Sequence, residues 1–291
     1  MFWDFEDRRI PLSTGLEMRV RSAGSGSPVV LLHGYPQTAA CWNKVAPRLV
    51  SAGYRVIAPD LRGYGGSDKP GSETETYTKR VMAADIAALM DAFEIESAAI
   101  IGHDRGGRVA HRMARDHGAR VRALTVLDIA PTLAMYQATD MDFATAYYHW
   151  FFLIQPAPLP ERLIGADPDF FLRSKLGHWG RSGMEVYAPE ALSEYLTAFR
   201  DPACIAATCA DYRASATIDL EHDREDAALL TMPLLALWGA EGFVGRKFDV
   251  LETWRACADN VTGHPVPGGH FLPEEAPEET TAALLAFLDK L

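Results

Sequence analysis

Short apolar runs alternate with amphipathic segments along much of the chain. The runs are rich in valine, isoleucine, leucine and alanine, and they span 29–32, 54–58, 98–101, 124–127 and 234–238. Between the second and third runs, the apolar residues of segment 77–93 recur about every 3.6 residues, as on one face of a helix. Continuous apolar strands that alternate with helices are typical of a parallel sheet covered on both faces. The pattern therefore predicts an α/β fold with a mostly parallel sheet flanked by helices.

The segment 132–227 interrupts this alternation. It contains aromatic and helix-like pieces, is divided by several prolines, and has no strand-like alternation. We interpret it as a helical cap inserted between two strands and placed over the active site. The predicted organisation is a core formed by 1–131 and 228–291, with the cap between its two parts.

The composition limits the possible partners. The chain of 291 residues carries a formal net charge of −11, which disfavours nucleic acid and anionic membranes. No signal peptide is visible, and no apolar stretch reaches the roughly 20 residues that a membrane span needs. The four cysteines are scattered and form no CxxC pair, so a disulfide framework or a zinc site is not expected. We expect a cytoplasmic protein that acts on a small molecule.

A glycine-flanked turn at 98–108 carries the most informative chemistry. Its central residue, Asp104, stands where hydrolases with a G-x-S-x-G turn keep their nucleophilic serine. A carboxylate that attacks an alkyl carbon forms an ester, which water can then open. The turn thus predicts displacement at an sp3 carbon, as in dehalogenation or epoxide opening. Asp104 could instead cap the helix that follows, but the flanking Gly102, Gly106 and Gly107 favour the nucleophile.

Polar residues that end neighbouring parallel strands should converge at one edge of the sheet. A late histidine is expected as the base, and His270 suits this better than its rival His264. Because Asp104 is already ionised near neutral pH, the base would activate the water of the second step. Asp128, after the run 124–127, is the preferred partner that orients this histidine, with Glu241 as the alternative.

The run from His33 to Pro36 is a candidate oxyanion loop. The backbone N–H groups of Tyr35 and Arg105 would bind the oxygen anion formed when water attacks the aspartyl ester. His33 itself could simply support the loop. The glycine-rich segment 63–67 lacks the ending of a phosphate loop and is interpreted as a structural turn.

Three segments together carry a resemblance to a known family. The motifs His33–Thr38, Asp60–Ser67 and Gly102–Arg108 resemble those of fluoroacetate dehalogenases, which have the α/β-hydrolase fold. Haloalkane dehalogenases and epoxide hydrolases are similar in fold and also use an aspartate, but they typically place tryptophan directly after it. Here Arg105 occupies that position.

The resemblance implies that Arg105 and Arg108 bind the carboxylate of the substrate. Arg108 follows Asp104 by four residues, about one helical turn, so both could face one cavity. Two guanidinium groups would offset the repulsion between an anionic substrate and Asp104. The alternative for Arg108 is an ordinary ion pair on the helix surface.

The resemblance also implies a halide site in the cap. The matching positions are His149, Trp150 and Tyr212, whose N–H and O–H groups could donate hydrogen bonds to a departing fluoride. Each could instead belong to the aromatic packing of the cap. Trp179 is expected to line the entrance or the pocket.

The expected activity is hydrolysis of fluoroacetate to glycolate and fluoride through an ester of Asp104, without a metal or an organic cofactor. A homodimer is an expectation from the resemblance alone. The alternatives are a haloalkane or 2-haloacid dehalogenase, a non-catalytic receptor, and an epoxide hydrolase. The last would use Tyr147, Tyr148 or Tyr212 to protonate the epoxide oxygen.

Overall fold

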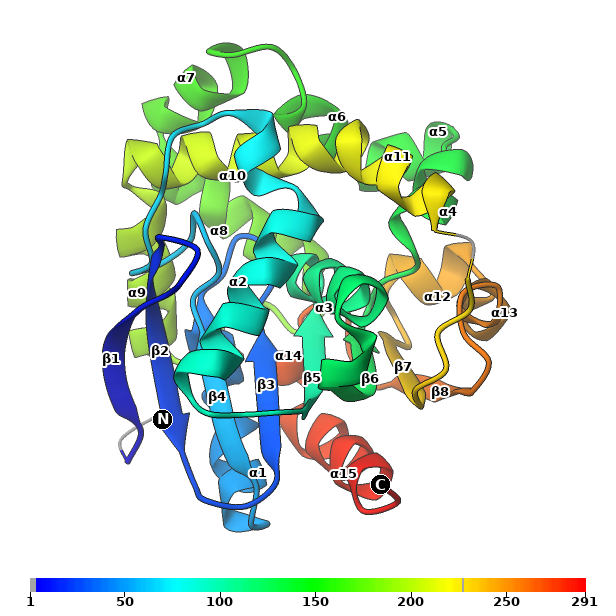
Figure 1. Ribbon diagram of the computed structural model, residues 1–291. Helices are drawn as coiled ribbons and strands as arrows, with labels where there is room; N and C mark the ends of the chain where they lie inside the picture. Colours follow the sequence, from blue (N-terminus) through cyan, green and yellow to red (C-terminus); the bar gives the residue numbers. More distant parts are fainter. Residues whose placement is uncertain (1–3, 227) are drawn as a thin grey trace.

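A twisted sheet forms the centre of the structure, a computed structural model that describes residues 4–226 and 228–291 (Figure 1). Within these residues, eight strands pair in the order β1-β2-β4-β3-β5-β6-β7-β8. The strands are β1 (Glu6–Pro11), β2 (Glu17–Ala23), β3 (Pro28–Leu32), β4 (Arg55–Pro59), β5 (Ala98–His103), β6 (Val121–Leu127), β7 (Leu234–Gly239) and β8 (Val261–Val266). The pairs β1–β2 and β2–β4 are antiparallel, and every other pair is parallel. The predicted α/β fold with a mostly parallel sheet is confirmed.

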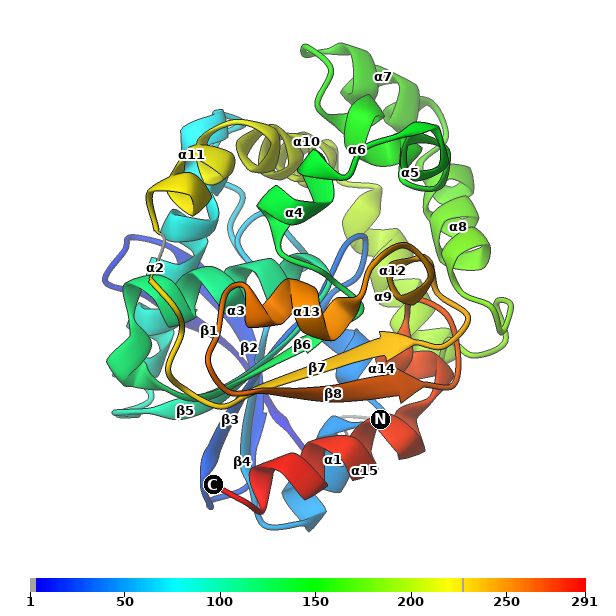
Figure 2. The same cartoon turned by 90° about the vertical axis from the view of Figure 1, so that its right-hand side faces the viewer.

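Helices cover both faces of this sheet (Figure 2). One face carries α2 (Lys79–Ala92), α3 (Arg105–Asp116) and α13 (Val250–Arg255), whereas α1 (Ala46–Ser51) and α15 (Pro277–Leu288) lie on the other. The remaining helical elements of the core are short: η1 (Ala39–Trp42), η2 (Thr74–Tyr77), η3 (Gly118–Arg120), α12 (Phe243–Lys247) and α14 (Leu272–Glu275).

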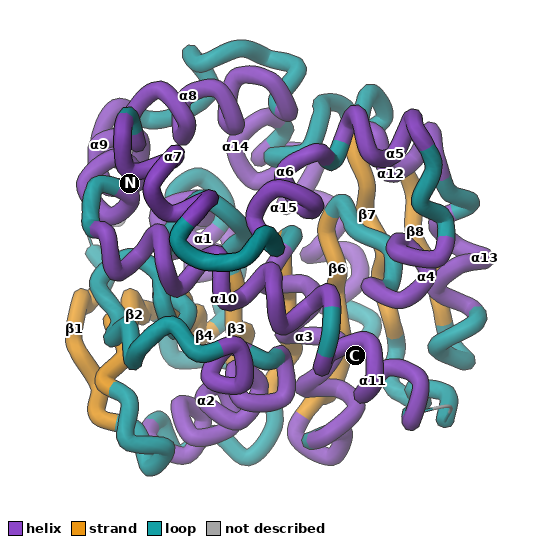
Figure 3. The backbone as a smooth tube through the Cα atoms, turned by 90° about the horizontal axis from the view of Figure 1, so that it is seen from above, coloured by secondary structure: helices purple, strands orange, loops and turns teal. Residues whose placement is uncertain are grey.

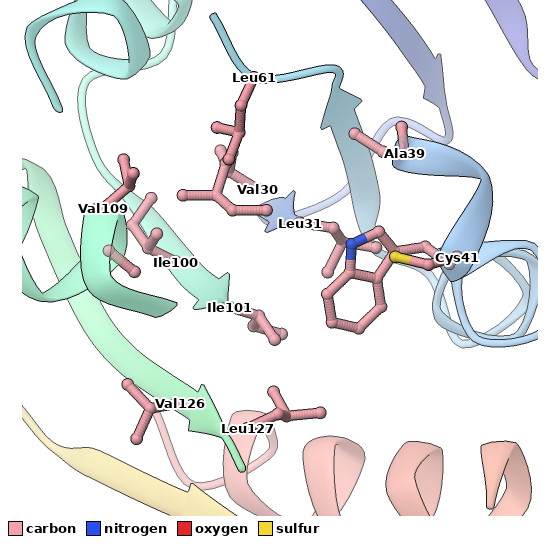
Figure 4. Packing of buried hydrophobic residues seen from close by; sticks show 14 of the residues in the cluster. Val30, Leu31, Ala39, Cys41, Leu61, Ile100, Ile101, Val109, Val126 and Leu127 are labelled. Atoms are coloured by element: carbon pink, nitrogen blue, oxygen red, sulfur yellow. The ribbon is translucent and has the colours of Figure 1, made fainter. Parts of the chain in front are cut away.

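The central strands are apolar along their length because both of their faces are covered. Every residue of β5 is buried, and its side chains alternate between the two layers. Figure 4 shows Ile100 beside Val109 of α3, while Ile101 of the same strand points the other way. This packing holds β5 in place within the sheet. It thereby fixes the position of Asp104, which directly follows the strand.

The edge strands were not predicted from the sequence. β1 is mostly exposed and β8 is partly exposed, so neither forms a continuous apolar run. The five predicted runs correspond to β3, β4, β5, β6 and β7, and the predicted helix 77–93 is observed as η2 followed by α2. Because the edge strands are exposed, hydrophobic patterning predicted the central strands of the sheet and missed the strands at its edges.

The helices between β6 and β7 lie across the carboxyl ends of the parallel strands (Figures 1 and 3). They are α4 (Thr132–Gln137), α5 (Met141–Ala146), α6 (Tyr148–Leu153), α7 (Leu159–Ala166), α8 (Pro168–Trp179), α9 (Pro189–Phe199), α10 (Pro202–Ala216) and α11 (Ile218–Glu225). This is the predicted helical cap between two strands. Its exact division from the core stays a prediction, and its predicted limit at residue 227 falls outside the described residues. None of the described helices has the length and apolar character to span a membrane.

The turn after β5 depends on close contact between two backbones. A Cβ atom on Gly106 would lie 2.4 Å from the carbonyl oxygen of Leu32 and 2.5 Å from that of His33. Both neighbours are backbone atoms at the end of β3, so they cannot rotate away. Gly106 therefore lets α3 start directly against the central strand.

Replacement of this glycine should destabilise the fold. Because the added methyl group must displace β3 from α3, Gly106→Ala should lower the free energy of unfolding by about 3 kcal/mol in urea denaturation. The control is Gly165→Ala in α7, where an added Cβ meets nothing within 4 Å. A Gly106→Ala variant as stable as the control would contradict this account of the turn.

Candidate active site

Asp104 lies in the turn between β5 and α3, and its backbone is strained. It has φ 46° and ψ −114°, a conformation with positive φ that non-glycine residues rarely adopt. Its side chain makes no capping hydrogen bond to α3, so the helix-cap alternative does not account for it. The residue is 1% exposed, and the turn holds its carboxylate below the cap.

The two carboxylate oxygens of Asp104 have different surroundings. Oδ1 accepts a hydrogen bond of 2.9 Å from the backbone N–H of Tyr35, whereas Oδ2 lies 3.8 Å from Nε2 of His270. Burial alone would raise the pKa of Asp104, but nearby cationic groups, led by His270, hold it below its ordinary value. The carboxylate is thus ionised, and among the described residues its Oδ2 accepts no backbone hydrogen bond.

His270 is fixed by a second aspartate. Its Nδ1 lies 2.6 Å from Oδ2 of Asp128, whose Oδ1 accepts a hydrogen bond of 2.9 Å from the backbone N–H of Gly239. Burial lowers the pKa of His270, but the hydrogen bond and charge of Asp128 outweigh it, and the net shift is upward. The alternatives lie elsewhere, since His264 is exposed on β8 and Glu241 is exposed after β7.

The predicted oxyanion loop lies against Asp104 and is supported from behind by His33. Nε2 of His33 accepts a hydrogen bond of 2.9 Å from the backbone N–H of Leu61, and burial lowers the pKa of this histidine. His33 therefore remains neutral and supports the loop. The N–H of Tyr35 is in place for the predicted role, and that of Arg105 directly follows the aspartate in the chain.

Most of the Arg105 guanidinium is already engaged. Nε and Nη2 donate to the two carboxylate oxygens of Asp211 on α10, and Nη2 also donates to Ser215. The face of the guanidinium lies 4.2 Å from the ring centre of Tyr212. Only Nη1 is buried without a partner within the described part of the chain.

Arg108 is held by neutral groups. Nη1 donates to Thr132 Oγ1 at 2.9 Å and to the carbonyl of Ala130 at 3.2 Å, and Nη2 lies 3.1 Å from the sulfur of Met135. Its side chain stacks on the Trp150 ring, and its Nε has no partner among the described residues. Arg108 is 3% exposed and forms no ion pair with a carboxylate among the described residues. The alternative of an ordinary ion pair on the helix surface is therefore excluded.

The three predicted halide ligands meet beneath the cap. His149, Trp150 and Tyr212 are each 0% exposed. The ring centre of Tyr212 lies 5.6 Å from that of His149 and 6.4 Å from that of Trp150. Both ring nitrogens of His149, the indole nitrogen of Trp150 and the Tyr212 hydroxyl are buried without a partner in residues 4–226 and 228–291. Aromatic packing alone does not explain such a cluster of unsatisfied polar groups.

Trp179 lies between this cluster and His270. Its ring centre lies 4.2 Å from that of His149 and 4.8 Å from that of His270. It also lines a cavity of about 200 Å³ together with Tyr147, Phe243 and His270. The expectation that Trp179 lines the entrance or the pocket agrees with this position.

Asp211 is a buried residue of the candidate site that sequence reasoning missed. It binds Arg105 across 106 positions of sequence and also contacts Lys79 of α2, while Tyr64 donates a hydrogen bond of 2.7 Å to its Oδ2. Its position directly before Tyr212 was the only sequence signal. The predicted structural turn 63–67 thus supplies one of its partners.

The chain is similar to known proteins along nearly its whole length. A family model described as alpha/beta hydrolase fold matches residues 27–277. A fluoroacetate dehalogenase from Burkholderia sp is 43% identical over 99% of this chain and 95% of its own. A soluble epoxide hydrolase from Corynebacterium sp. (strain C12) is 35% identical over 95% of each chain. The crystal structure of ALR0039 from Nostoc sp PCC 7120 covers all of both chains with a TM-score of 0.98 and 52% identity.

Removal of the Asp128 charge should lower the pKa of His270. The Asp128→Asn variant keeps the shape of the side chain but loses the anion that stabilises the imidazolium, so burial then dominates. Histidine NMR titration, with the signal assigned through His270→Gln, should show His270 titrating at lower pH than in the unmodified protein. An unchanged pKa would mean that Asp128 does not set the charge of the base.

Proposed function

The chain belongs to the α/β-hydrolase family, and we propose that it is a haloacetate dehalogenase that hydrolyses fluoroacetate to glycolate and fluoride. The observation that carries this proposal is the buried Arg108, which interacts with the charge of Asp104 but forms no ion pair with a carboxylate among the described residues. A buried cation needs a compensating charge. A small substrate with a carboxylate would provide it.

The two arginines would share this carboxylate through single contacts. Asp211 engages Nε and Nη2 of Arg105, and neutral acceptors engage both terminal nitrogens of Arg108. Nη1 of Arg105 and Nε of Arg108 are left to donate to the substrate. Each arginine would thus contribute one nitrogen, rather than two parallel hydrogen bonds from a single guanidinium.

The first step is displacement of halide by Asp104. Its Oδ2 attacks the α-carbon in line with the carbon–halogen bond, while Oδ1 keeps its hydrogen bond from Tyr35. A carbon–oxygen bond forms and the halide leaves with the electron pair of the broken bond. The free donors of His149, Trp150 and Tyr212 would stabilise the departing anion.

The second step is hydrolysis of the ester at the carboxyl carbon of Asp104. Nε2 of His270 removes a proton from water, which attacks that carbon. The negative charge develops on Oδ1, where the N–H groups of Tyr35 and Arg105 stabilise it. The intermediate then expels the hydroxyl oxygen of glycolate, which takes the proton back from His270, and leaves Asp104 as a carboxylic acid. This acid releases its proton to solvent, and the carboxylate of Asp104 is restored.

Formation of the ester would itself prepare the base. The charge of Asp104 helps to hold the pKa of His270 up, and the ester is neutral. Once the aspartate is alkylated, the pKa of His270 falls and more of it is in the neutral form that can accept a proton. The loss of the Asp104 charge in the first step therefore favours the second step.

Epoxide hydrolysis is the competing reaction, because an epoxide hydrolase is among the similar proteins and the Tyr212 hydroxyl is free. A neutral epoxide would bring no carboxylate for the free donors of Arg105 and Arg108. Among the other tyrosines, Tyr148 is 43% exposed, which suits a buried acid less well. Cytoplasmic location and a homodimer stay predictions, and a haloalkane or 2-haloacid dehalogenase stays an alternative.

Loss of the base should trap the ester. With fluoroacetate, His270→Ala should release at most one fluoride per active site and gain the mass of one carboxymethyl group on the peptide that contains Asp104, as seen by mass spectrometry. His264→Ala, which removes the exposed histidine of β8, should turn over normally. Asp104→Asn should release no fluoride and gain no mass. Full turnover by Asp104→Asn would overturn the mechanism.

Loss of Arg108 should selectively lower the activity on substrates that carry a carboxylate. Arg108→Met keeps an apolar side chain against Trp150 but removes the charge, so kcat/KM for fluoroacetate should fall by about 100-fold or more. Arg173→Met, at an exposed position of α8, is the matched control and should behave as the unmodified enzyme. If Arg108→Met kept its activity on fluoroacetate, or if a neutral epoxide were the only compound turned over, the carboxylate assignment would be wrong.

A further inference from the structure

Lys175 on α8 is a buried cation without an anionic partner. Its side chain is nearly enclosed, with 2% of the residue exposed. Within residues 4–226 and 228–291, no carboxylate forms an ion pair with its ammonium group. Lysine is rarely buried without such a partner.

Aromatic faces surround the ammonium instead. Nζ lies 3.6 Å from the ring centre of Tyr148, 5.6 Å from that of Phe171 and 5.8 Å from that of Trp179. Such faces attract a cation and do not neutralise it. The positive charge therefore remains available to act on neighbouring groups.

The neighbouring groups are those assigned to the halide. Tyr148 directly precedes His149, and the ring centre of Trp179 lies 4.2 Å from that of His149. Burial first, and then the charge of Lys175, hold the pKa of His149 well below its ordinary value. His149 is thus a neutral imidazole that can donate one N–H to an anion.

We propose that Lys175 is a positioning residue of the halide site: its caged ammonium supplies the positive potential that a neutral His149 lacks, so that halide binds more tightly when Lys175 is protonated. The identity of the anion rests on the proposed function. Lys175 would act through Trp179 and His149 and would not touch the halide.

The carboxylates around α8 are engaged elsewhere and do not hold Lys175 in its charged form. Glu161 of α7 pairs with Arg213. Glu194 of α9 pairs with Arg21. On α8 itself Asp169 pairs with Arg200. On α9 Glu190 is exposed, as are Arg173 and His178 of α8.

Burial lowers the pKa of Lys175 to about 7. The group is therefore charged below neutral pH and loses its charge as the pH rises through that value. Halide affinity should fall over the same interval. The pKa of His270 is raised above its ordinary value, and His270 also loses its positive charge as the pH rises. Variants must therefore separate the effect of Lys175 from that of His270.

The test measures bromide binding by quenching of tryptophan fluorescence, at about pH 6 and about pH 9. Lys175→Met removes the charge, and it should bind bromide about tenfold more weakly than the unmodified protein at the lower pH and equally at the higher. Lys175→Arg keeps a charge that does not titrate, so it should bind bromide more tightly than the unmodified protein at the higher pH. Lys290→Met, at an exposed position, controls for net charge.

A Lys175→Met variant with unchanged affinity at both pH values would overturn the inference, as would an unmodified protein that binds no bromide. If Lys175→Met does not fold by circular dichroism, the Lys175→Arg result at the higher pH decides. Fluoride release from fluoroacetate is measured separately. A protein with the expected bromide behaviour that releases no fluoride would refute the proposed function and leave the role of Lys175 standing.

Discussion

The burial of an ionised carboxylate is the constraint on which the rest of this structure depends. Asp104 is removed from water, so its charge must be balanced by fixed groups. The N–H of Tyr35, the His270–Asp128 pair and Arg108 supply that balance from separate elements of the core. The strained turn is the cost of presenting the carboxylate to all of them at once, and the glycine contacts beneath it make that turn possible.

Core and cap contribute different parts of the chemistry. The core supplies the aspartate, the histidine and the arginines from the ends of its parallel strands and the start of α3. The cap supplies His149, Trp150 and Tyr212 as polar groups without partners. On the proposed function, the core would form and break the ester, while the cap would determine which leaving group is tolerated. Relatives that share the core could then differ in reaction through the cap alone.

The sequence predicted the parts of the site that follow from local rules. Asp104 and Asp128 end buried strands, and the glycines of the turn lie within a few residues of the aspartate, so short patterns sufficed. The predicted halide ligands came only from resemblance, since one aromatic residue among many in a cap carries no pattern of its own. Asp211 and Lys175 were missed because their partners come from distant segments or are aromatic faces, which leave no periodic signal. The exposed strands β1 and β8 were missed for want of a continuous apolar run.

The contacts of Asp211 have a consequence for how the cap moves. This residue belongs to the cap, yet it neutralises two buried cations of the core, Arg105 and Lys79. Lifting α10 would leave Arg105 without its carboxylate partner in a dry interior, at about 3–5 kcal/mol, and would leave Lys79 only its longer contact of 3.8 Å with Asp219 of α11. These ion pairs therefore oppose any opening of the cap at α10. On the proposed function, a small acid would enter without lifting α10, and the cavity beside Trp179 and His270 is the candidate route.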